Sequence, residues 1–154
     1  IGKKFKANTN IKKGENTMFK WKDDFSVNIK SIDEQHQELF KIGSNLYTIV
    51  SAKDGIDRYD EIMEVLAHLK NYALYHFSYE EELMKKYGYD KYEVQKREHE
   101  LFVKKVQSIS EEEVDEKQRK VGMEIIMFIA NWIENHILRS DMGYSEYLNN
   151  KGVK

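Results

Sequence analysis

Four histidines occupy core-facing positions on four separate apolar stripes of this 154-residue sequence. Further polar side chains accompany two of them at four-residue spacing. The set comprises His36, His76 with Glu80, Gln95 with His99, and His136. Side chains four residues apart on a helix share one face, about 6 Å apart along the axis. A buried carboxylate without a partner is costly, and a bound cation removes that cost for several groups at once, so the pattern predicts a metal site.

Asp141 is a further candidate ligand, although a regular helix would not bring it to the same site. It follows His136 by five residues, and five steps turn an α-helix by about 500°, some 140° away from the histidine's face. Both residues can reach one site only if the helix loosens or ends between Ile137 and Asp141. Ser140 and Gly143 favour an ending there.

The ligand types narrow the choice of metal. Imidazole and carboxylate without thiolate suit iron, zinc or manganese, and the chain has no cysteine. Two carboxylates and four imidazoles are too many for one tetrahedral zinc, and the paired Glu-x-x-His motifs of a ferritin-like site are absent from the core faces. A single inward histidine is usually a hydrogen-bonded core residue, but one on each helix indicates a dinuclear centre, with iron as the expected metal. His68 lies off the ligand face and is expected to be structural or exposed.

Four amphipathic helices carry these residues. Apolar side chains recur at three- and four-residue steps over 32–50, 62–87, 92–109 and 121–139, with breaks near residues 54, 88 and 111. We expect Asp33 to be the first N-cap, Gly88 to end the second helix, and Tyr144 to Leu148 to add one or two more turns. The predicted fold is all-α, an antiparallel up-down-up-down four-helix bundle with a di-metal site in its core.

Composition excludes several other classes of protein. There is no proline to break long helices, and 25 basic against 27 acidic residues give a net charge of −2, which favours neither nucleic acid nor an anionic membrane. No segment reaches the roughly 18 apolar residues of a membrane span, and no signal peptide is evident. We expect a cytoplasmic domain over 18–154, preceded by a polar, basic tail or linker over 1–17. The start at Ile1 fits either a piece of a longer polypeptide or an ordinary terminus.

From Phe19 to about Leu148 the sequence resembles the hemerythrins, and among them the bacteriohemerythrins. The resemblance rests on Trp21, Ser26-Val27-Asn28-Ile29, Ile32-Asp33-Glu34-Gln35-His36, His76-Phe77-Ser78-Tyr79-Glu80-Glu81, Arg97-Glu98-His99, Trp132-Ile133-Glu134-Asn135-His136 and Asp141. These motifs occur in the family's order, one set on each predicted helix. The resemblance implies two iron ions joined by an oxo or hydroxo group.

The resemblance also implies a role for each ligand. His36 and His76 would bind one iron, and His99 and His136 would bind the other. Glu80 and Asp141 would bridge the two. In the family, the iron with two histidines keeps an open position for dioxygen.

One residue departs from the family pattern. A third histidine is expected four residues before His99, and this sequence has Gln95 there. A carboxamide oxygen is a weaker ligand than imidazole. Gln95 can coordinate through its oxygen, can hydrogen-bond a water that fills the position, or can leave the role to Glu98, which we rank last because it lies about 100° from the face of His99.

Three functions compete. The first is binding of dioxygen for sensing or for carriage and storage, with Leu39, Phe40, Ile133 and Ile137 excluding water; the basic tail faintly resembles a chemotaxis receptor and suggests an upstream signalling module. The second is a di-iron enzyme that reduces peroxide or dioxygen at the position opened by Gln95. No dedicated acid–base pair supports turnover, and Tyr79, Glu81 and Tyr144 are candidates by sequence proximity alone. The third is a structural bundle holding zinc.

Overall fold

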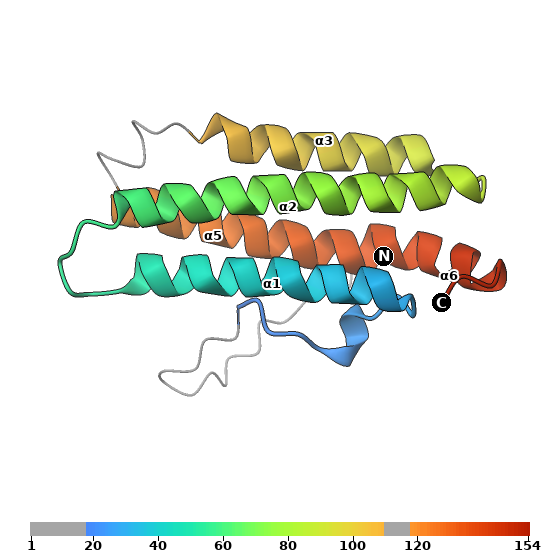
Figure 1. The fold of residues 1–154 in the computed structure, drawn as a ribbon, viewed down its shortest axis with the longest axis horizontal. Coiled ribbons are helices and arrows are strands. Elements are labelled where there is room, and N and C mark those ends of the chain that lie inside the picture. Colours follow the sequence, from blue (N-terminus) through green and yellow to red (C-terminus); the bar gives the residue numbers. More distant parts are fainter. Residues whose placement is uncertain (1–17, 110–117) are drawn as a thin grey trace, which may run out of the picture.

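Helices account for all the regular structure that the computed structural model shows in its described residues, 18–109 and 118–154 (Figure 1). The elements in order are η1, a 3-10 helix (Asp23–Phe25), α1 (Lys30–Ser51), α2 (Tyr59–Lys86), α3 (Tyr92–Ser108), α5 (Gln118–Asn135), η2, a π-helix (His136–Asp141), and α6 (Met142–Asn150). The tail predicted over 1–17 and the break predicted near residue 111 lie outside the described residues.

The four long helices form an antiparallel bundle. α1 packs against both α2 and α5, and α2 packs against α3 (Figure 1). Successive long helices run in opposite directions, because the connections that the structure describes are short. The predicted up-down-up-down arrangement is confirmed, and each of the four helices turns one face toward a common interior.

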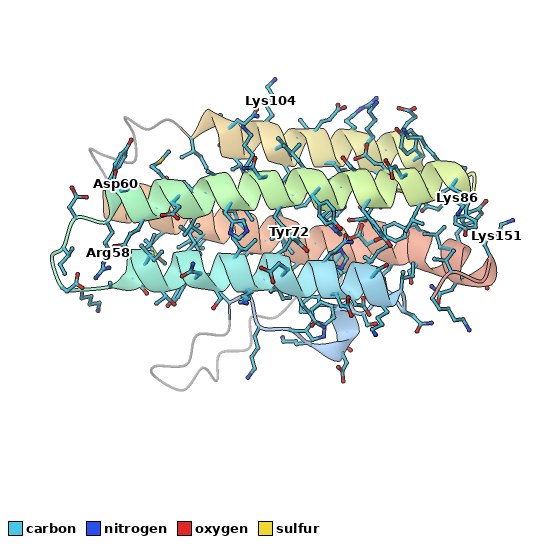
Figure 2. The ribbon with its side chains drawn as sticks, viewed as in Figure 1. Arg58, Asp60, Tyr72, Lys86, Lys104 and Lys151 are labelled. Carbon is cyan, nitrogen blue, oxygen red and sulfur yellow. The ribbon has the colours of Figure 1, made fainter. Side chains whose placement is uncertain are left out.

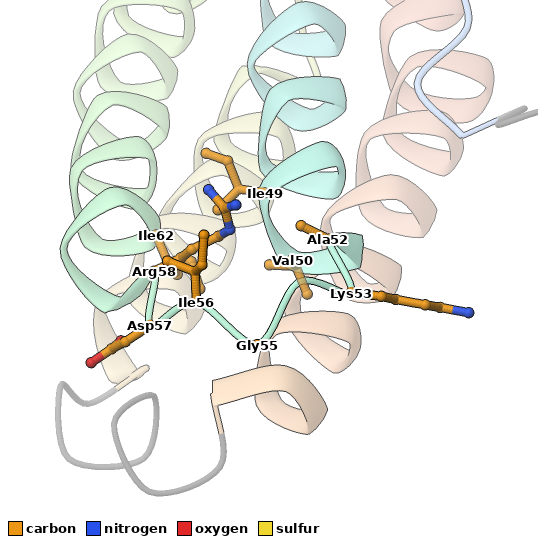
Figure 3. A pocket seen from close by; sticks show the side chains of 9 residues that line it. All are labelled: Ile49, Val50, Ala52, Lys53, Gly55, Ile56, Asp57, Arg58 and Ile62. Carbon is orange, nitrogen blue, oxygen red and sulfur yellow. The ribbon is translucent and has the colours of Figure 1, made fainter.

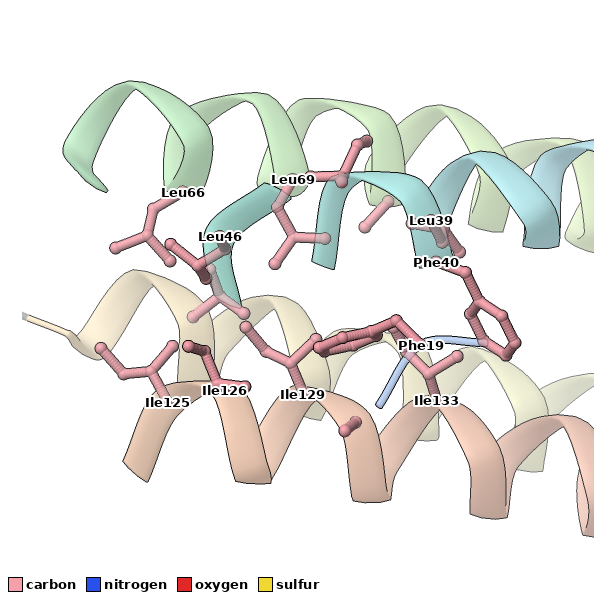
Figure 4. Packing of buried hydrophobic residues seen from close by; sticks show 14 of the residues in the cluster. Phe19, Leu39, Phe40, Leu46, Leu66, Leu69, Ile125, Ile126, Ile129 and Ile133 are labelled. Carbon is pink, nitrogen blue, oxygen red and sulfur yellow. The ribbon is translucent and has the colours of Figure 1, made fainter. Parts of the chain in front are cut away.

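The main apolar core packs side chains of the long helices against one another and against the segment before α1 (Figure 4). Its labelled members come from the arm before α1 and from α1, α2 and α5: Phe19, Leu39, Phe40, Leu46, Leu66, Leu69, Ile125, Ile126, Ile129 and Ile133. Burying one such side chain contributes on the order of 2 kcal/mol. Gly43 lets the arm approach, since a Cβ there would collide with the ring of Phe19.

The start of α1 differs from the prediction. Ile29, with extended backbone, is the N-cap residue, and it makes no side-chain capping bond. Asp33 therefore lies inside the first turn rather than at the cap. Its carboxylate instead reaches back along the chain, accepting hydrogen bonds from the Val27 N–H at 2.8 Å and the Ser26 hydroxyl at 2.5 Å. The prediction was wrong because this carboxylate stabilises the preceding turn, and the helix begins four residues earlier than a cap at Asp33 would place it.

The other end of the bundle has a second apolar cluster, which the sequence only partly predicted. Gly88 adopts a φ of +68° just after α2, as expected for a helix-ending glycine. α6 is a nine-residue helix that extends the one or two turns predicted over Tyr144 to Leu148 at both ends. It closes this end by burying Tyr144 and Leu148 against Met84 and Tyr89.

Charged side chains cover the outside of the bundle. Figure 2 labels Lys86, Lys104 and Lys151, which are all exposed. No helix among the described residues is long and apolar enough to cross a lipid bilayer. The connection between α1 and α2 surrounds a surface hollow of about 520 Å³ beside Val50, Gly55 and Arg58 (Figure 3). None of the predicted metal ligands lines this hollow.

Candidate metal centre

A π-helical turn places Asp141 on the same face as His136. η2 follows α5 without interruption, and the N–H of Met142 donates to the carbonyl of Ile137, five residues earlier. A turn with this wider spacing stacks residues five apart, whereas an α-turn would separate them. The predicted loosening between Ile137 and Asp141 therefore occurs, but as a widened turn rather than as the end of the helix.

All six predicted ligands are buried in the interior of the bundle. Their exposed fractions lie between 0% and 6%. They come from α1, α2, α3 and η2: His36, His76, Glu80, His99, His136 and Asp141. Within the described residues, two sets of three have ligand atoms within 4.8 Å of one another, His36–His76–Glu80 and Glu80–His99–His136. We call the six residues the cage. Glu80 belongs to both sets, so its carboxylate lies between two candidate metal positions.

Asp141 also reaches both halves of the cage. Its Oδ2 lies 3.2 Å from Nε2 of His36, and its Oδ1 lies 3.1 Å from Nε2 of His136. One carboxylate oxygen thus faces each half. Nε2 of His99 lies 3.0 Å from Nε2 of His136, and Nε2 of His76 contacts Oε1 of Glu80.

Three of the imidazoles are fixed from behind by polar side chains. Nδ1 of His76 lies 2.7 Å from the amide oxygen of Gln35. The corresponding acceptors are Glu81 for His99, at 2.9 Å, and Glu98 for His136, at 2.7 Å. When Nδ1 donates outward, Nε2 carries the lone pair that faces the cage, which is the arrangement of metal-binding histidines.

Unpartnered polar atoms show that the cage suits a cation. Both ring nitrogens of His36, both oxygens of Glu80, Oδ2 of Asp141 and the amide oxygen of Gln95 are buried without a hydrogen-bond partner in the described structure. Buried polar atoms are rarely left in this state, and carboxylates least of all. Inward nitrogen and oxygen lone pairs in this number fit metal ions of the iron, manganese or zinc type.

The carboxylates inside the cage raise the pKa values of two of its imidazoles, whereas burial lowers the pKa of His76. Burial alone would lower the pKa of His36, but its contacts with the carboxylates of Asp141 and Glu80 outweigh burial and raise it to about 9. Burial likewise opposes protonation of His136, and Asp141, Glu98 and Glu80 together raise its pKa to about 10. Without metal, the cage carboxylates therefore favour a positive charge beside them.

Gln95 lies on the cage side of α3. It is only 2% exposed, its amide nitrogen lies 3.5 Å from Oδ1 of Asp141, and its amide oxygen has no partner. These positions agree with coordination through the oxygen and with a hydrogen bond to a water. The remaining interpretation, that Glu98 supplies the missing ligand, is wrong. Glu98 lies behind His136 and accepts the Ser140 hydroxyl at 2.6 Å, so it faces away from the cage and does not replace the missing ligand.

Two of the three acid–base candidates make hydrogen bonds with other side chains. The Tyr79 hydroxyl donates to Ser31 at 2.8 Å, and Glu81 holds His99. The exception is Tyr144, which is fully buried with an unpartnered hydroxyl. His68 is exposed, as expected, and belongs to neither ligand set.

Aromatic rings form one wall of the cage. The Phe77 ring stacks on His99 with centroids 4.0 Å apart, and the Trp132 ring stacks on His136 at 4.4 Å. The four apolar residues expected to exclude water, Leu39, Phe40, Ile133 and Ile137, are all at most 3% exposed. The centre is therefore enclosed on this side by apolar surface, which strengthens the electrostatic interactions inside it.

The residues behind the imidazoles were not predicted as positioning residues. Gln35, Glu81 and Glu98 each adjoin a cage residue in the sequence, at His36, Glu80 and His99. Each nonetheless serves a histidine on a different helix. A signal was present, since a polar residue about 100° from an inward face points toward a neighbouring helix. Which neighbour it meets depends on how the helices are rotated about their axes.

Comparisons with known proteins agree with this centre. A family model described as the hemerythrin HHE cation binding domain matches residues 27–148. A bacteriohemerythrin of Clostridium acetobutylicum is 41% identical over 127 residues, covering 82% of this chain and 98% of that protein. A bacteriohemerythrin of Pseudomonas aeruginosa is 34% identical over 125 residues, or 80% of this chain and 77% of that protein.

A solved structure supports the same relationship. The crystal structure of a leucine-to-phenylalanine mutant superimposes with a TM-score of 0.71 and 26% identity, covering 82% of this chain and 94% of that one. The family model spans residues 27–148, a range that includes every cage residue, and both relatives match at least 80% of this chain. This chain belongs to the hemerythrin family.

Proposed function

We propose that this chain is a non-heme di-iron domain that binds dioxygen reversibly and serves in oxygen sensing or in oxygen carriage and storage. Hemerythrin-family proteins bind non-heme iron, and the chain carries buried groups suited to metal. The observation that carries the proposal is that two three-residue ligand sets share Glu80. A single ion needs only one such set.

The positions of the cage atoms support a ligand assignment. His36 and His76 would hold one iron, and His99 and His136 would hold the other. Glu80 and Asp141 would be shared between them, because Glu80 belongs to both sets and Asp141 directs one oxygen toward each half. Two reduced irons held there would supply the electrons with which dioxygen is bound.

The chain's own residues favour binding over turnover. Gln35, Glu81 and Glu98 hold three imidazoles in one orientation, and the rings of Phe77 and Trp132 stack on two of them. Two of the three acid–base candidates are engaged elsewhere. A site with rigid ligands and few mobile protons is suited to holding a small molecule and releasing it unchanged.

Gln95 supports a second candidate function, a di-iron enzyme that reduces peroxide or dioxygen. The amide is neutral, and its oxygen has no partner in the described structure. A weaker ligand at this position leaves a metal site that can exchange its ligand, as metal catalysis requires. Attachment to an upstream chemotaxis-type signalling module is a further proposal, and it rests on the basic composition of residues 1–17 alone.

Anaerobic purification separates these functions. Iron is counted per chain, and the visible spectrum is followed after adding oxygen and then peroxide. We expect two irons per chain and an absorption band that forms with oxygen and disappears on degassing. Rapid oxidation with repeated consumption of peroxide would instead support the enzyme, and fewer than one iron per chain after reconstitution would contradict both.

A further inference from the structure

Tyr144 combines complete burial with an unpartnered hydroxyl. Its exposed fraction is 0%, and it is the largest of the fully buried side chains. The hydroxyl has no hydrogen-bond partner in the described structure. A buried hydroxyl without a partner destabilises a protein, so phenylalanine would pack better if the ring alone were required.

The hydroxyl faces the carboxylates of the cage. Met84, which follows Glu80 by one turn of α2, packs in the same cluster as Tyr144. Burial raises the pKa of the Tyr144 hydroxyl well above its usual value, and the carboxylates of Asp141 and Glu80 raise it further, Glu80 also as a hydrogen-bond acceptor. Asp141 already has imidazoles beside both oxygens, with Nε2 of His136 and the Gln95 amide near Oδ1 and Nε2 of His36 3.2 Å from Oδ2. Oε2 of Glu80 has no partner among the described residues. Glu80 is therefore the natural acceptor.

The π-helical turn is what brings Tyr144 to this position. Tyr144 follows Asp141 by three residues, so it lies on the same face of α6 one turn later. The same widening that directs Asp141 into the cage therefore directs Tyr144 toward it. The ring of Tyr89 contacts Tyr144 edge-on at 6.4 Å, and Met84 and Leu148 complete its surroundings.

We propose that Tyr144 is a positioning residue of the metal centre, whose hydroxyl donates a hydrogen bond to Oε2 of Glu80 when metal is bound. This inference rests on the proposed metal centre. A carboxylate oxygen has two lone pairs, so one oxygen of Glu80 can accept the phenol and bind an ion at the same time. The bond fixes the orientation in which Glu80 faces both metal positions. α6 carries Tyr144 and therefore positions this bond.

The test is a comparison of Tyr144→Phe with Tyr89→Phe. Tyr89 belongs to the same cluster and is nearly as buried, and its hydroxyl lies against Gly143. Zinc affinity is measured by competition with a chelator, and thermal unfolding is measured on the metal-free chains. We expect Tyr144→Phe to weaken zinc binding by about 10- to 100-fold, the range found for residues that orient metal ligands. We also expect its metal-free form to unfold at the same or a higher temperature.

A loss of zinc affinity without a loss of thermal stability distinguishes this positioning role from a role in packing alone. Zinc affinity within twofold of the unmodified chain would overturn the proposal, as would an equal effect of Tyr89→Phe. An unmodified chain that binds no zinc would overturn the metal centre itself. If Tyr144→Phe does not fold, the unmodified chain labelled with 13C at tyrosine Cζ provides the answer. The resonance of Tyr144 must move on zinc loading while that of Tyr89 stays in place, and a stationary Tyr144 resonance would overturn the proposal.

Discussion

Asp141 places Oδ1 3.1 Å from Nε2 of His136, although five residues separate the two along a continuous helix. The contact exists because the backbone widens to a π-turn between them. Such turns are rare and occur frequently at functional sites. In this chain the turn converts a residue on the wrong face into one whose carboxylate faces both halves of the cage.

Replacing Asp141 should therefore affect both metal positions. We expect Asp141→Asn to weaken metal binding by more than about 100-fold, beyond the effect of losing an orienting residue, because the change removes a charge and a ligand shared by both ions. Equilibrium dialysis followed by metal analysis measures the affinity. Asp90→Asn, on an exposed residue, is the matched control. Two metals per chain with unchanged affinity would contradict a bridging role for Asp141.

Glu98 and Glu81 should act through the histidines that they hold. We expect Glu98→Gln or Glu81→Gln to weaken metal binding by about 10- to 100-fold, because an amide accepts a hydrogen bond from Nδ1 less strongly than a carboxylate does. Isothermal titration of the metal-free chains measures the effect. Glu100→Gln, on an exposed residue of α3, should change nothing. Equal affinities for all three variants would show that these contacts do not orient the ligands.

Gln95 sets the stability of the oxygen-bound form. We expect Gln95→His to slow the decay of the visible absorption band formed with oxygen, because imidazole is a stronger ligand and leaves no exchangeable position on that side. Stopped-flow spectroscopy under air measures the decay. The control is Gln107→His, which adds a histidine at an exposed position of the same helix. If Gln95→His leaves both spectrum and kinetics unchanged, Gln95 does not control this position.

The four helices and their inward faces could be predicted because helical periodicity is a local property of the sequence. Features that depend on neighbouring helices could not. Asp33 was expected to cap α1, but its partners Ser26 and Val27 become available only in the folded turn before the helix. The outward hydrogen bonds of the imidazoles depend on the rotation of each helix, and the burial of Phe19 depends on its contact with Gly43 on α1.

The metal-free chain should lose stability as the pH rises from neutral toward 10. The folded-state pKa values of His36 and His136 are about 9 and about 10, above the usual value of 6.5. A group with a raised pKa binds its proton more tightly in the folded chain, so its stabilising contribution is complete below pH 6.5 and is lost as the pH passes the folded value. We expect the unfolding temperature of the chelator-treated chain to fall between pH 7 and pH 10.

A matched variant separates this effect from general alkaline destabilisation. In His136→Gln the titrating imidazole is absent, so the fall in unfolding temperature over the same pH interval should be smaller. Metal loading should also reduce the pH dependence, because bound metal replaces the protons on the imidazoles. Calorimetry of both chains, with and without metal, measures how steeply the unfolding temperature falls with pH in each of the four cases. A metal-free chain whose unfolding temperature is constant to pH 10 would show that the cage carboxylates do not hold protons on His36 and His136.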